Sequence, residues 1–461
     1  MMTHTHFIGI GGSGLSAIAR VLLERGEKVT GSDREYTLMA EALERAGAQV
    51  YVGHNRENIF GADVAIRSSA VADENVEVQA AKEVGIPVLR REDYLGQLLA
   101  DQKVVAVAGS HGKTTVTSMI AWMLTALNQT PGFISGGMIE NMGVNARAGE
   151  GALFVIEADE YDNMFLGLEP AIAIVTNVEH DHPDFFPTPE VFAQAFRDFV
   201  ARLKPEGTLA VCVDDPGATA LLNEKSLKGK NTLTYGLSKD AQYQARNLRS
   251  DGRSGFHFDV YRGDTYLTPV TLQVPGKHNV VNALAALIVA DLQGLSMDEA
   301  ALALGEFRGA ERRFDLAGEI EGITVIDDYA HHPTEIRATL DAARERYPGR
   351  YLWALWQPHT YSRTSQLLSD YETAFEDADG VVVTPVYAAR ETQPDGFSLR
   401  KVVEAIKHQE IHFAHGLTEA GDFLLSQVER GDVVLVLSAG DAIEVSVRLL
   451  SELSEMESQY A

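Results

Sequence analysis

The sequence predicts an α/β protein made of three successive domains, each built around a largely parallel sheet. The chain has 461 residues, which exceeds the size of one ordinary domain. Short apolar runs alternate with amphipathic stretches along most of it, and this alternation is typical of parallel-sheet architecture. Glycine-containing loops at residues 9–14 and 109–115 each follow an apolar run and open a helix. We place the domains at residues 1–98, 99–309 and 310–461.

The first domain is predicted to be Rossmann-like. Strands are expected over residues 6–10, 28–32, 63–69 and 86–91, and a helix over residues 13–25. Gly9, Gly11 and Gly14 match the G-x-G-x-x-G pattern between the first strand and the helix, and Asp33 follows the second strand. Such a turn can hold a diphosphate on a helix N-terminus, while the acidic residue bonds a ribose or a base. The motif predicts a nucleotide or pyrophosphate site and is only weak evidence for a nicotinamide cofactor.

The central domain opens with the strongest local signal in the sequence. An apolar strand over residues 103–109 enters a glycine-containing loop that begins a helix with Lys113 and Thr114. In this pattern the backbone N–H groups face a phosphate, the lysine reaches the β- and γ-phosphates, and the threonine hydroxyl ligates Mg²⁺. Val107 stands where the strict pattern has glycine. We therefore predict a shortened P-loop and a P-loop ATPase domain.

Two more segments of the central domain carry polar groups at strand ends. Glu157 directly follows an apolar run and supplies the carboxylate that a nucleotide-bound Mg²⁺ needs. A second strand ends in the dense cluster 177–184, which contains His182, and this cluster indicates a metal or catalytic edge. The domain is completed by a strand over residues 208–215, added antiparallel hairpins over 242–275 and a helix over 279–293.

The third domain is predicted to be Rossmann-like as well. Strands are expected over residues 323–329, 351–358, 380–386 and 432–440, with helices from Pro333 and Tyr361. Polar clusters at residues 327–335 and 357–364 fall at strand ends. Open α/β sheets bind ligands outside the carboxyl ends of their strands, so both clusters are candidate ligand sites.

The composition limits the class of partner. Acidic residues outnumber basic ones by 66 to 39, and a net charge of −27 disfavours nucleic acid and anionic membranes as partners. Cys212 is the single cysteine, which rules out a disulfide within the chain and fits a reducing cytoplasm. We expect neither a membrane span nor a signal peptide, because long apolar runs and a basic N-terminal region are both missing from the sequence.

Eight segments resemble a known family. FIGIGGSGLSAIA, AGSHGKTT, EADE, TNVEHDHPD, GKHNVVNA, ERRFD, DDYAHHPTEI and QPHTYSRT occur in the order seen in the Mur ligases of peptidoglycan synthesis. The resemblance covers essentially the whole chain. The N-terminal glycine motif, DDYAHHPTEI and QPHTYSRT are most similar to the branch that adds L-alanine.

The resemblance implies an ATP- and Mg²⁺-dependent ligation of L-alanine to UDP-N-acetylmuramate. The lactyl carboxylate would attack the γ-phosphate of ATP, and the amine of L-alanine would attack the resulting acyl phosphate. Two anions meet in the first step, so neutralising their charge is the main catalytic task. We expect a cytoplasmic monomer or weak homodimer that acts on these two small molecules.

The resemblance also implies a role for individual residues. Lys113, Glu157, His182, Arg313 and Asp328 would be catalytic, and Thr114, Glu157 and His182 would hold metal. ATP would contact Gly109, Ser110, His111, Gly112, Lys113, Thr114, Thr115, Asn279, Asn282, Arg313 and Asp328. The UDP-sugar would contact Gly11, Gly12, Ser13, Gly14, Asp33, His54, Ser68 and Ser69, and L-alanine would contact Tyr329, His359 and Arg363.

Departures from the family pattern leave alternatives open. The helix after the His182 cluster offers no lysine over residues 191–200, so a carbamylated lysine is not expected. Thr360 stands where an arginine is common, and EADEYD is similar to the ligase that attaches a recycled tripeptide, L-Ala-γ-D-Glu-diaminopimelate, to the same acceptor. Alternatives in other classes are a NAD(P)-dependent oxidoreductase and a non-catalytic nucleotide-binding scaffold. The oxidoreductase leaves the P-loop unexplained, and the scaffold leaves Lys113 and Glu157 unexplained.

Overall fold

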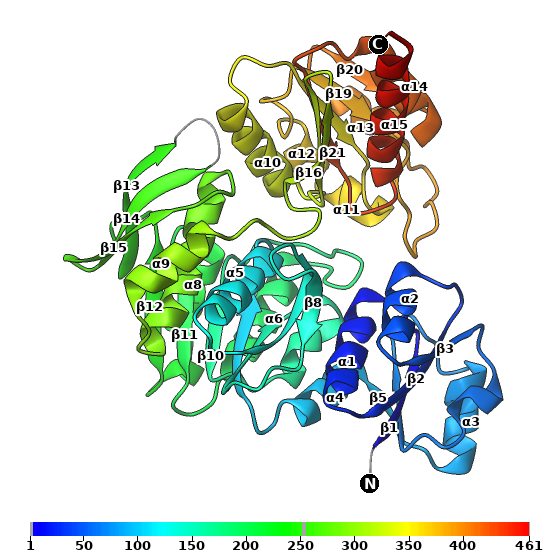
Figure 1. Cartoon of the computed structure of the whole chain (residues 1–461), viewed down its shortest axis with the longest axis vertical. Helices are drawn as coiled ribbons and strands as arrows, with labels where there is room; N and C mark the ends of the chain where they lie inside the picture. The colour runs from blue at the N-terminus through cyan, green and yellow to red at the C-terminus, as the bar shows by residue number, and fades with distance from the viewer. Residues whose placement is uncertain (1–2, 251–254, 461) are drawn as a thin grey trace.

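The computed structural model describes residues 3–250 and 255–460 and contains three sheets in chain order. Figure 1 shows the N-terminal sheet in blue, the central sheet in cyan and green, and the C-terminal sheet in yellow to red. Each sheet is largely parallel and has helices beside it, so the α/β prediction is confirmed. The boundaries near residues 98 and 310 stay a prediction.

The N-terminal sheet is wholly parallel, in the order β3-β2-β1-β4-β5. Its strands are β1 (His4–Ile8), β2 (Lys28–Asp33), β3 (Gln49–Val52), β4 (Val64–Arg67) and β5 (Val88–Arg90). Its helices are α1 (Ser13–Glu24), α2 (Leu38–Arg45), α3 (Val76–Val84) and α4 (Arg91–Leu98). The strand order changes direction between β1 and β4, so the glycine loop after β1 lies where ligands bind in open sheets.

The central sheet has ten strands in the order β15-β14-β13-β12-β11-β10-β6-β9-β7-β8. Its strands are β6 (Lys103–Ala108), β7 (Gly132–Ile139), β8 (Val144–Arg147), β9 (Leu153–Glu157), β10 (Ile172–Val175), β11 (Thr208–Cys212), β12 (Asn231–Gly236), β13 (Tyr243–Ser250), β14 (Phe256–Arg262) and β15 (Thr265–Thr271). Its helices are α5 (Lys113–Ala126), α6 (Pro189–Ala201), α7 (Pro216–Ala220), α8 (Lys277–Leu292) and α9 (Met297–Gly305). β13, β14 and β15 pair antiparallel, which confirms the predicted hairpins.

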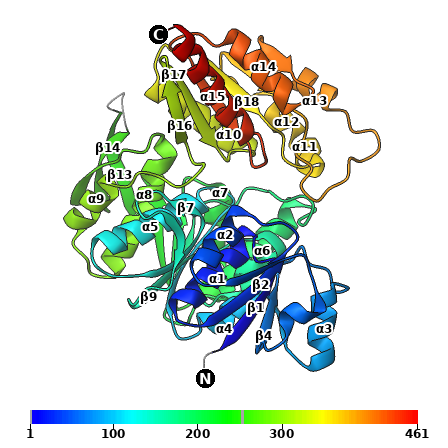
Figure 2. The ribbon, with the colours of Figure 1, turned by 45° about the vertical axis from the view of Figure 1, so that its right-hand side comes forward.

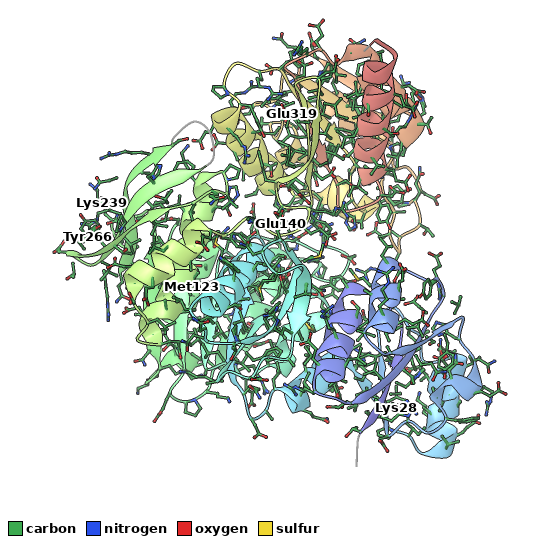
Figure 3. All side chains as sticks on the ribbon, viewed as in Figure 1. Lys28, Met123, Glu140, Lys239, Tyr266 and Glu319 are labelled. Atoms are coloured by element: carbon green, nitrogen blue, oxygen red, sulfur yellow. The ribbon has the colours of Figure 1, made fainter. Side chains whose placement is uncertain are left out.

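Side chains in the central domain follow this layering. Met123 of α5 is fully buried, whereas Tyr266 on the outermost strand is 50% exposed and projects from the edge of the sheet (Figure 3). The helix predicted from Asn279 begins two residues earlier, at Lys277. α5 and α8 both lie against this sheet, and their buried faces share one hydrophobic core with its strands.

The C-terminal sheet has the order β16-β17-β21-β18-β19-β20, and only β16 pairs antiparallel within the described part of the chain. Its strands are β16 (Asp315–Ile320), β17 (Ile323–Asp328), β18 (Leu352–Trp356), β19 (Gly380–Val383), β20 (Ile411–Phe413) and β21 (Val433–Leu437). Its helices are α10 (Pro333–Arg346), α11 (Tyr361–Gln366), α12 (Leu368–Tyr371), α13 (Leu399–Ala405), α14 (Leu417–Gln427) and α15 (Ile443–Tyr460).

The three domains are joined in different ways. One hydrophobic core runs from Ile18 and Leu22 of α1 to Phe154 of β9, so the N-terminal and central domains share buried apolar surface. Figure 2 shows α1 lying beside the central sheet. The C-terminal domain has separate cores on the two faces of its sheet and meets the central domain through polar side chains. Over residues 3–250 and 255–460, the helices are too short or too polar to cross a membrane.

Candidate active site

The P-loop connects β6 to α5. Gly109 has φ +143°, and a Cβ built there would lie 1.9 Å from Thr176 Oγ1, so only glycine fits. Gly112 is the N-cap of α5 with φ +81°. Because glycine has no side chain, the amides of the first helical turn are left uncovered at the N-cap. The loop therefore offers backbone N–H groups and the positive end of a helix dipole to an anion.

Lys113 lies in this loop with its ammonium turned inward. Its Nζ donates to the carbonyl oxygens of Gly109 and Ser110 and forms an ion pair with Glu160 at 2.9 Å. Burial works to lower the lysine pKa, but Glu160, Asp159 and Glu157 outweigh it, and the pKa is raised. The ammonium is thus held charged beside the phosphate-binding loop.

Glu157 and Thr114 form an oxygen pair at the end of β9. Thr114 Oγ1 donates to Glu157 Oε1 at 3.1 Å, and the backbone N–H of Gly136 donates to Glu157 Oε2 at 2.6 Å. Burial raises the pKa of Glu157, although Lys113 opposes this shift. A hydroxyl next to a carboxylate is the donor set that Mg²⁺ prefers, so these two residues fit the predicted cation.

His182 lines one large cavity together with Lys113, Thr114 and Glu157, but its side chain contacts Arg363 and Glu160. It has φ +53°, its Nδ1 lies 3.3 Å from Arg363 Nη2, and its Nε2 lies 3.5 Å from Glu160 Oε1. Since Arg363 can only donate, Nδ1 accepts, and Nε2 carries the proton that faces Glu160. The metal role of His182 stays a prediction, because ligation through Nε2 would require the ring to change its proton or its orientation.

A pocket next to the P-loop lies between the central and C-terminal domains. Asn279 and Asn282 of α8 line it together with Arg313 and Asp328, as the resemblance implies for ATP contacts. The two asparagines are hydrogen-bonded to each other, with Asn282 Nδ2 3.0 Å from Asn279 Oδ1. Asp328 accepts from the backbone N–H groups of Phe314 and Ala330, and burial raises its pKa to about 6. α8 supplies the two asparagines, β17 ends at Asp328, and Arg313 lies in the segment between α9 and β16.

The residues predicted to receive L-alanine lie together, but Arg363 is not free. It is only 2% exposed, its Nε donates to Asp181 Oδ1 at 2.7 Å, and its Nη1 lies 2.7 Å from His359 Nδ1. Burial acts to raise the pKa of Asp181, but Arg363 and the neighbouring histidines together outweigh it and hold this pKa well below its usual range, so the carboxylate stays charged. Burial holds the pKa of His359 at about 2, which leaves the ring neutral and able to accept from Arg363. Tyr329, His359 and Arg363 all line the large cavity that also contains Lys113.

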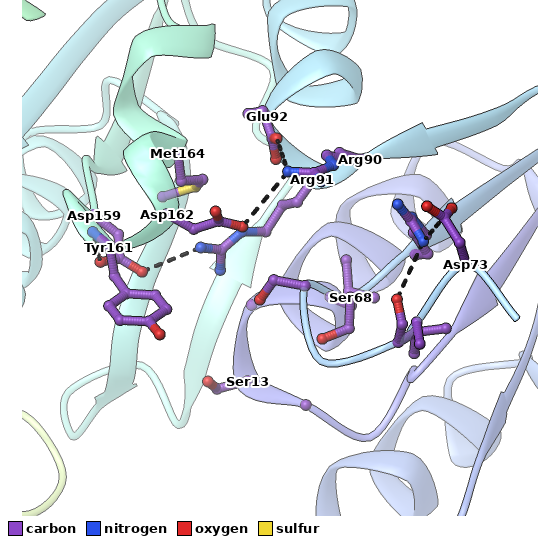
Figure 4. Close-up of a pocket in the computed structure, with 17 residues that line it drawn as sticks. Ser13, Ser68, Asp73, Arg90, Arg91, Glu92, Asp159, Tyr161, Asp162 and Met164 are labelled. Atoms are coloured by element: carbon purple, nitrogen blue, oxygen red, sulfur yellow. Dashed lines mark hydrogen bonds and ion pairs between the residues drawn. The ribbon is translucent and has the colours of Figure 1, made fainter. Parts of the chain in front are cut away.

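The N-terminal glycine loop faces a polar cleft of about 480 Å³. It is lined by five residues predicted for the UDP-sugar site, Gly12, Ser13, Gly14, Ser68 and Ser69, and by Arg67, Arg90 and Arg91. Figure 4 shows Arg91 reaching across the cleft to Asp159 of the central domain, where Nη2 and Oδ2 are 3.1 Å apart. The arginines were not predicted as site residues, although Arg90 and Arg91 end the strand expected over residues 86–91.

Gly11, Asp33 and His54 lie outside the described lining of this cleft. Asp33 Oδ2 accepts a hydrogen bond from the backbone N–H of Gly11 at 2.8 Å, and this contact stabilises the glycine loop. His54 Nδ1 lies 2.9 Å from Ser32 Oγ and 3.4 Å from the buried carboxylate of Glu77. The structure therefore gives Asp33 and His54 supporting contacts, and their binding of a UDP-sugar stays a prediction.

His111 joins the P-loop to the C-terminal domain. Its Nε2 lies 3.1 Å from Glu179 of the central domain, and its Nδ1 lies 3.1 Å from Glu335 of α10. Burial opposes the charge, but the two glutamates raise the His111 pKa to about 9. His332 completes a cluster with ligand atoms within 4.8 Å, yet its Nδ1 accepts from the Thr334 backbone N–H, so its Nε2 carries a proton. This cluster is better suited to hydrogen bonding across the junction than to holding a metal.

The junction is expected to weaken at alkaline pH. Glu179 and Glu335 raise the His111 pKa from 6.5 to about 9, and the Glu335 contact exists only when the domains meet. Its contribution to the junction is therefore complete below pH 6.5 and is lost as the pH rises through 9. Small-angle scattering at pH 6.5, 8 and 10 measures this as an increase in the radius of gyration. The His111→Asn variant is the control, and an equal increase in that variant would assign the change to other groups.

Three α/β domains around a P-loop, with a further cleft on either side, define an enzyme that brings a nucleoside triphosphate to two other small molecules. Sequence profiles agree with this class: "Mur ligase family, catalytic domain" matches residues 4–103, "Mur ligase middle domain" residues 107–290, and "Mur ligase, glutamate ligase domain" residues 312–440. The chain belongs to the Mur ligase family.

Individual relatives are similar over nearly their whole length. UDP-N-acetylmuramate–L-alanine ligase of Roseiflexus sp. (strain RS-1) is 44% identical, over 98% of this chain and 99% of the relative. The enzyme of that name from Caldanaerobacter subterraneus subsp. tengcongensis is 41% identical, over 97% of each chain. Among solved structures, UDP-N-acetylmuramate-alanine ligase from Thermotoga maritima has a TM-score of 0.82 at 30% identity, over 99% of this chain and 100% of that one. A murein peptide ligase from Psychrobacter arcticus has a TM-score of 0.72 at 26% identity, over 98% of each chain.

Proposed function

We propose that this protein uses ATP to join L-alanine to UDP-N-acetylmuramate through an acyl phosphate, the first stem-peptide step of peptidoglycan synthesis. One observation carries the proposal: a single cavity of about 800 Å³ is lined by all three domains. Gly14 and Arg91 come from the N-terminal domain, Lys113 from the central domain, and Tyr329 from the C-terminal domain. Full-length relatives with the corresponding name support the choice of substrates.

The N-terminal cleft would hold the diphosphate of UDP-N-acetylmuramate. Arg67, Arg90 and Arg91 line this cleft, and each is ion-paired with a carboxylate of the same lining. A bound diphosphate would compete with these carboxylates for the three guanidinium groups. The glycine loop adds backbone N–H groups at the start of α1. Because this cleft and the large cavity share Ser13, Gly14 and Arg91, the lactyl carboxylate of the bound sugar can extend toward the P-loop.

At the P-loop, the carboxylate would attack the γ-phosphorus while the bond to the β–γ bridging oxygen breaks and ADP leaves. Lys113 and the loop N–H groups would neutralise the phosphates. Thr114 and Glu157 would hold Mg²⁺, which supplies further positive charge at the reacting phosphate when it is bound. The amine of L-alanine would then attack the acyl carbon, lose a proton and displace inorganic phosphate.

The C-terminal domain would complete both sites. Arg313 and Asp328 line the pocket that also contains Asn279 and Asn282, so ATP would be enclosed only when this domain lies against the central one. Tyr329 and His359 line the large cavity from the same domain, where L-alanine would enter. We further propose that the enzyme works in the cytoplasm as a monomer or weak homodimer.

The donor preference tests this function directly. With MgATP and UDP-N-acetylmuramate present, ADP release is expected to depend strongly on L-alanine and to be much slower with glycine, L-serine or L-Ala-γ-D-Glu-diaminopimelate. A coupled assay of ADP, with mass spectrometry of the product, measures both. Turnover only with the tripeptide would keep the mechanism and replace the substrate, while folded protein that binds ATP but shows no donor-dependent turnover would refute the ligase assignment.

A further inference from the structure

Glu160 is a buried carboxylate that the proposed mechanism leaves without a role. It lies three residues after Glu157, between β9 and the 3₁₀ helix Tyr161–Gly167, and its side chain is fully buried. Both of its oxygens lie near nitrogen donors: the Lys113 ammonium Nζ is 3.0 Å from Oε1 and 2.9 Å from Oε2, and His182 Nε2 is 3.5 Å from Oε1. A carboxylate is rarely buried this completely without such partners.

The ammonium of Lys113 is fully occupied by these contacts. An ammonium has three N–H donors, and Lys113 directs them to the carbonyls of Gly109 and Ser110 and to Glu160. Contact with a triphosphate therefore requires Lys113 to give up at least one of these partners. Glu160 is the charged partner and so the strongest competitor for the ammonium.

The same carboxylate also orients His182. Nδ1 of this ring faces Arg363, so the proton lies on Nε2 and points toward Glu160. His182 has the left-handed backbone conformation φ +53°, which is uncommon for a residue other than glycine. Its ring is thus fixed between one group from the C-terminal domain and one from the central domain.

We propose that Glu160 is a positioning residue that retracts Lys113 from the phosphate site and releases it when the nucleotide arrives. The proposal rests on the proposed function, because it assigns Lys113 to the phosphates of ATP. The Glu160 carboxylate and the polyphosphate compete for the Lys113 ammonium, so nucleotide binding must displace Glu160 from it. Once the ammonium has moved, His182 becomes the remaining partner of Glu160.

The test is nucleotide affinity without turnover. In the Glu160→Gln variant the competing charge is removed, and a non-hydrolysable ATP analogue with Mg²⁺ is expected to bind about tenfold more tightly. KM for ATP is expected to fall with the tighter binding. The kcat for ADP release is also expected to fall, because His182 loses its charged acceptor. The Glu160→Asp variant, which keeps the charge, is expected to return the affinity toward that of the wild type. Affinity is measured without sugar or amino acid, so the result does not depend on which donor the enzyme uses.

A double-mutant cycle separates retraction of Lys113 from general repulsion of the polyphosphate. If Glu160 acts through Lys113, the gain from Glu160→Gln disappears in a Lys113→Met background. Glu169→Gln is the matched control, since that carboxylate is 63% exposed and pairs with Arg202. Thermal unfolding establishes that each variant is folded. An unchanged or weaker affinity in folded Glu160→Gln protein, or an equal gain in the Lys113→Met background, would overturn the proposal.

Discussion

Replacing Lys113 with alanine is expected to lower kcat by roughly 10³-fold while UDP-N-acetylmuramate binds almost as in the wild type. The ammonium lies in the P-loop, where it would neutralise the phosphates that the substrate carboxylate approaches. The sugar cleft is instead lined by the arginines of the N-terminal domain, and Lys113 is not part of its described lining. Stopped-assay kinetics and calorimetric titration of the UDP-sugar measure the two effects separately.

Lys103→Ala is the control for this substitution. Lys103 is exposed and begins β6, so it lies at the opposite end of this strand from the P-loop. Its Nζ donates to Gln293 Oε1 at 2.9 Å. We expect this variant to keep wild-type turnover. Equal loss of turnover and of UDP-sugar binding in folded Lys113→Ala protein would show that the two sites are not divided between the domains as described.

Replacing Arg363 with methionine is expected to destabilise the junction of the central and C-terminal domains by about 3–5 kcal/mol, because a buried carboxylate is left without its cation. Asp181 is 3% exposed and accepts from Arg363 at 2.7 Å, so it cannot recover its hydration without opening the junction. Denaturant unfolding is expected to show an earlier transition, and KM for L-alanine is expected to rise.

The double variant Asp181→Asn/Arg363→Met separates the two possible roles of this arginine. If the ion pair is mainly structural, removing both charges restores much of the stability and part of the affinity for L-alanine. If Arg363 instead receives the carboxylate of L-alanine, the single variant would keep its stability and raise only KM. The second outcome would favour the role implied by family resemblance over the contacts that the structure shows.

Much of the fold could be predicted because local patterns specify it. The P-loop strand and helix, Glu157 at the end of β9 and the hairpins over 242–275 all follow from apolar periodicity and turn residues next to each other in the chain. The antiparallel strand β16 was not predicted. None of its six residues is buried, so its sequence lacks the buried apolar run that marks the parallel strands.

The partners of the site residues could not be predicted in the same way. His111 meets Glu335, which is 224 positions away, and Arg363 meets Asp181, which is 182 positions away. A motif identifies chemistry carried by neighbouring residues, but it does not state which distant charge will neutralise a given side chain. For this reason Glu160 and Glu335 were not predicted as site residues. The pairing of Arg363 with Asp181 was not predicted either, and its contact with L-alanine stays a prediction.

The single cysteine makes the chain convenient for following its motions by fluorescence. Cys212 is 5% exposed, and burial raises the pKa of its thiol to about 12, so it reacts slowly with maleimide dyes near neutral pH. Cysteines introduced at Val52 and Val447, which are 65% and 66% exposed on the N-terminal and C-terminal domains, would then label selectively without removal of the native thiol. Energy transfer between such a dye pair would report, in single molecules, how far the outer domains approach each other during each catalytic cycle.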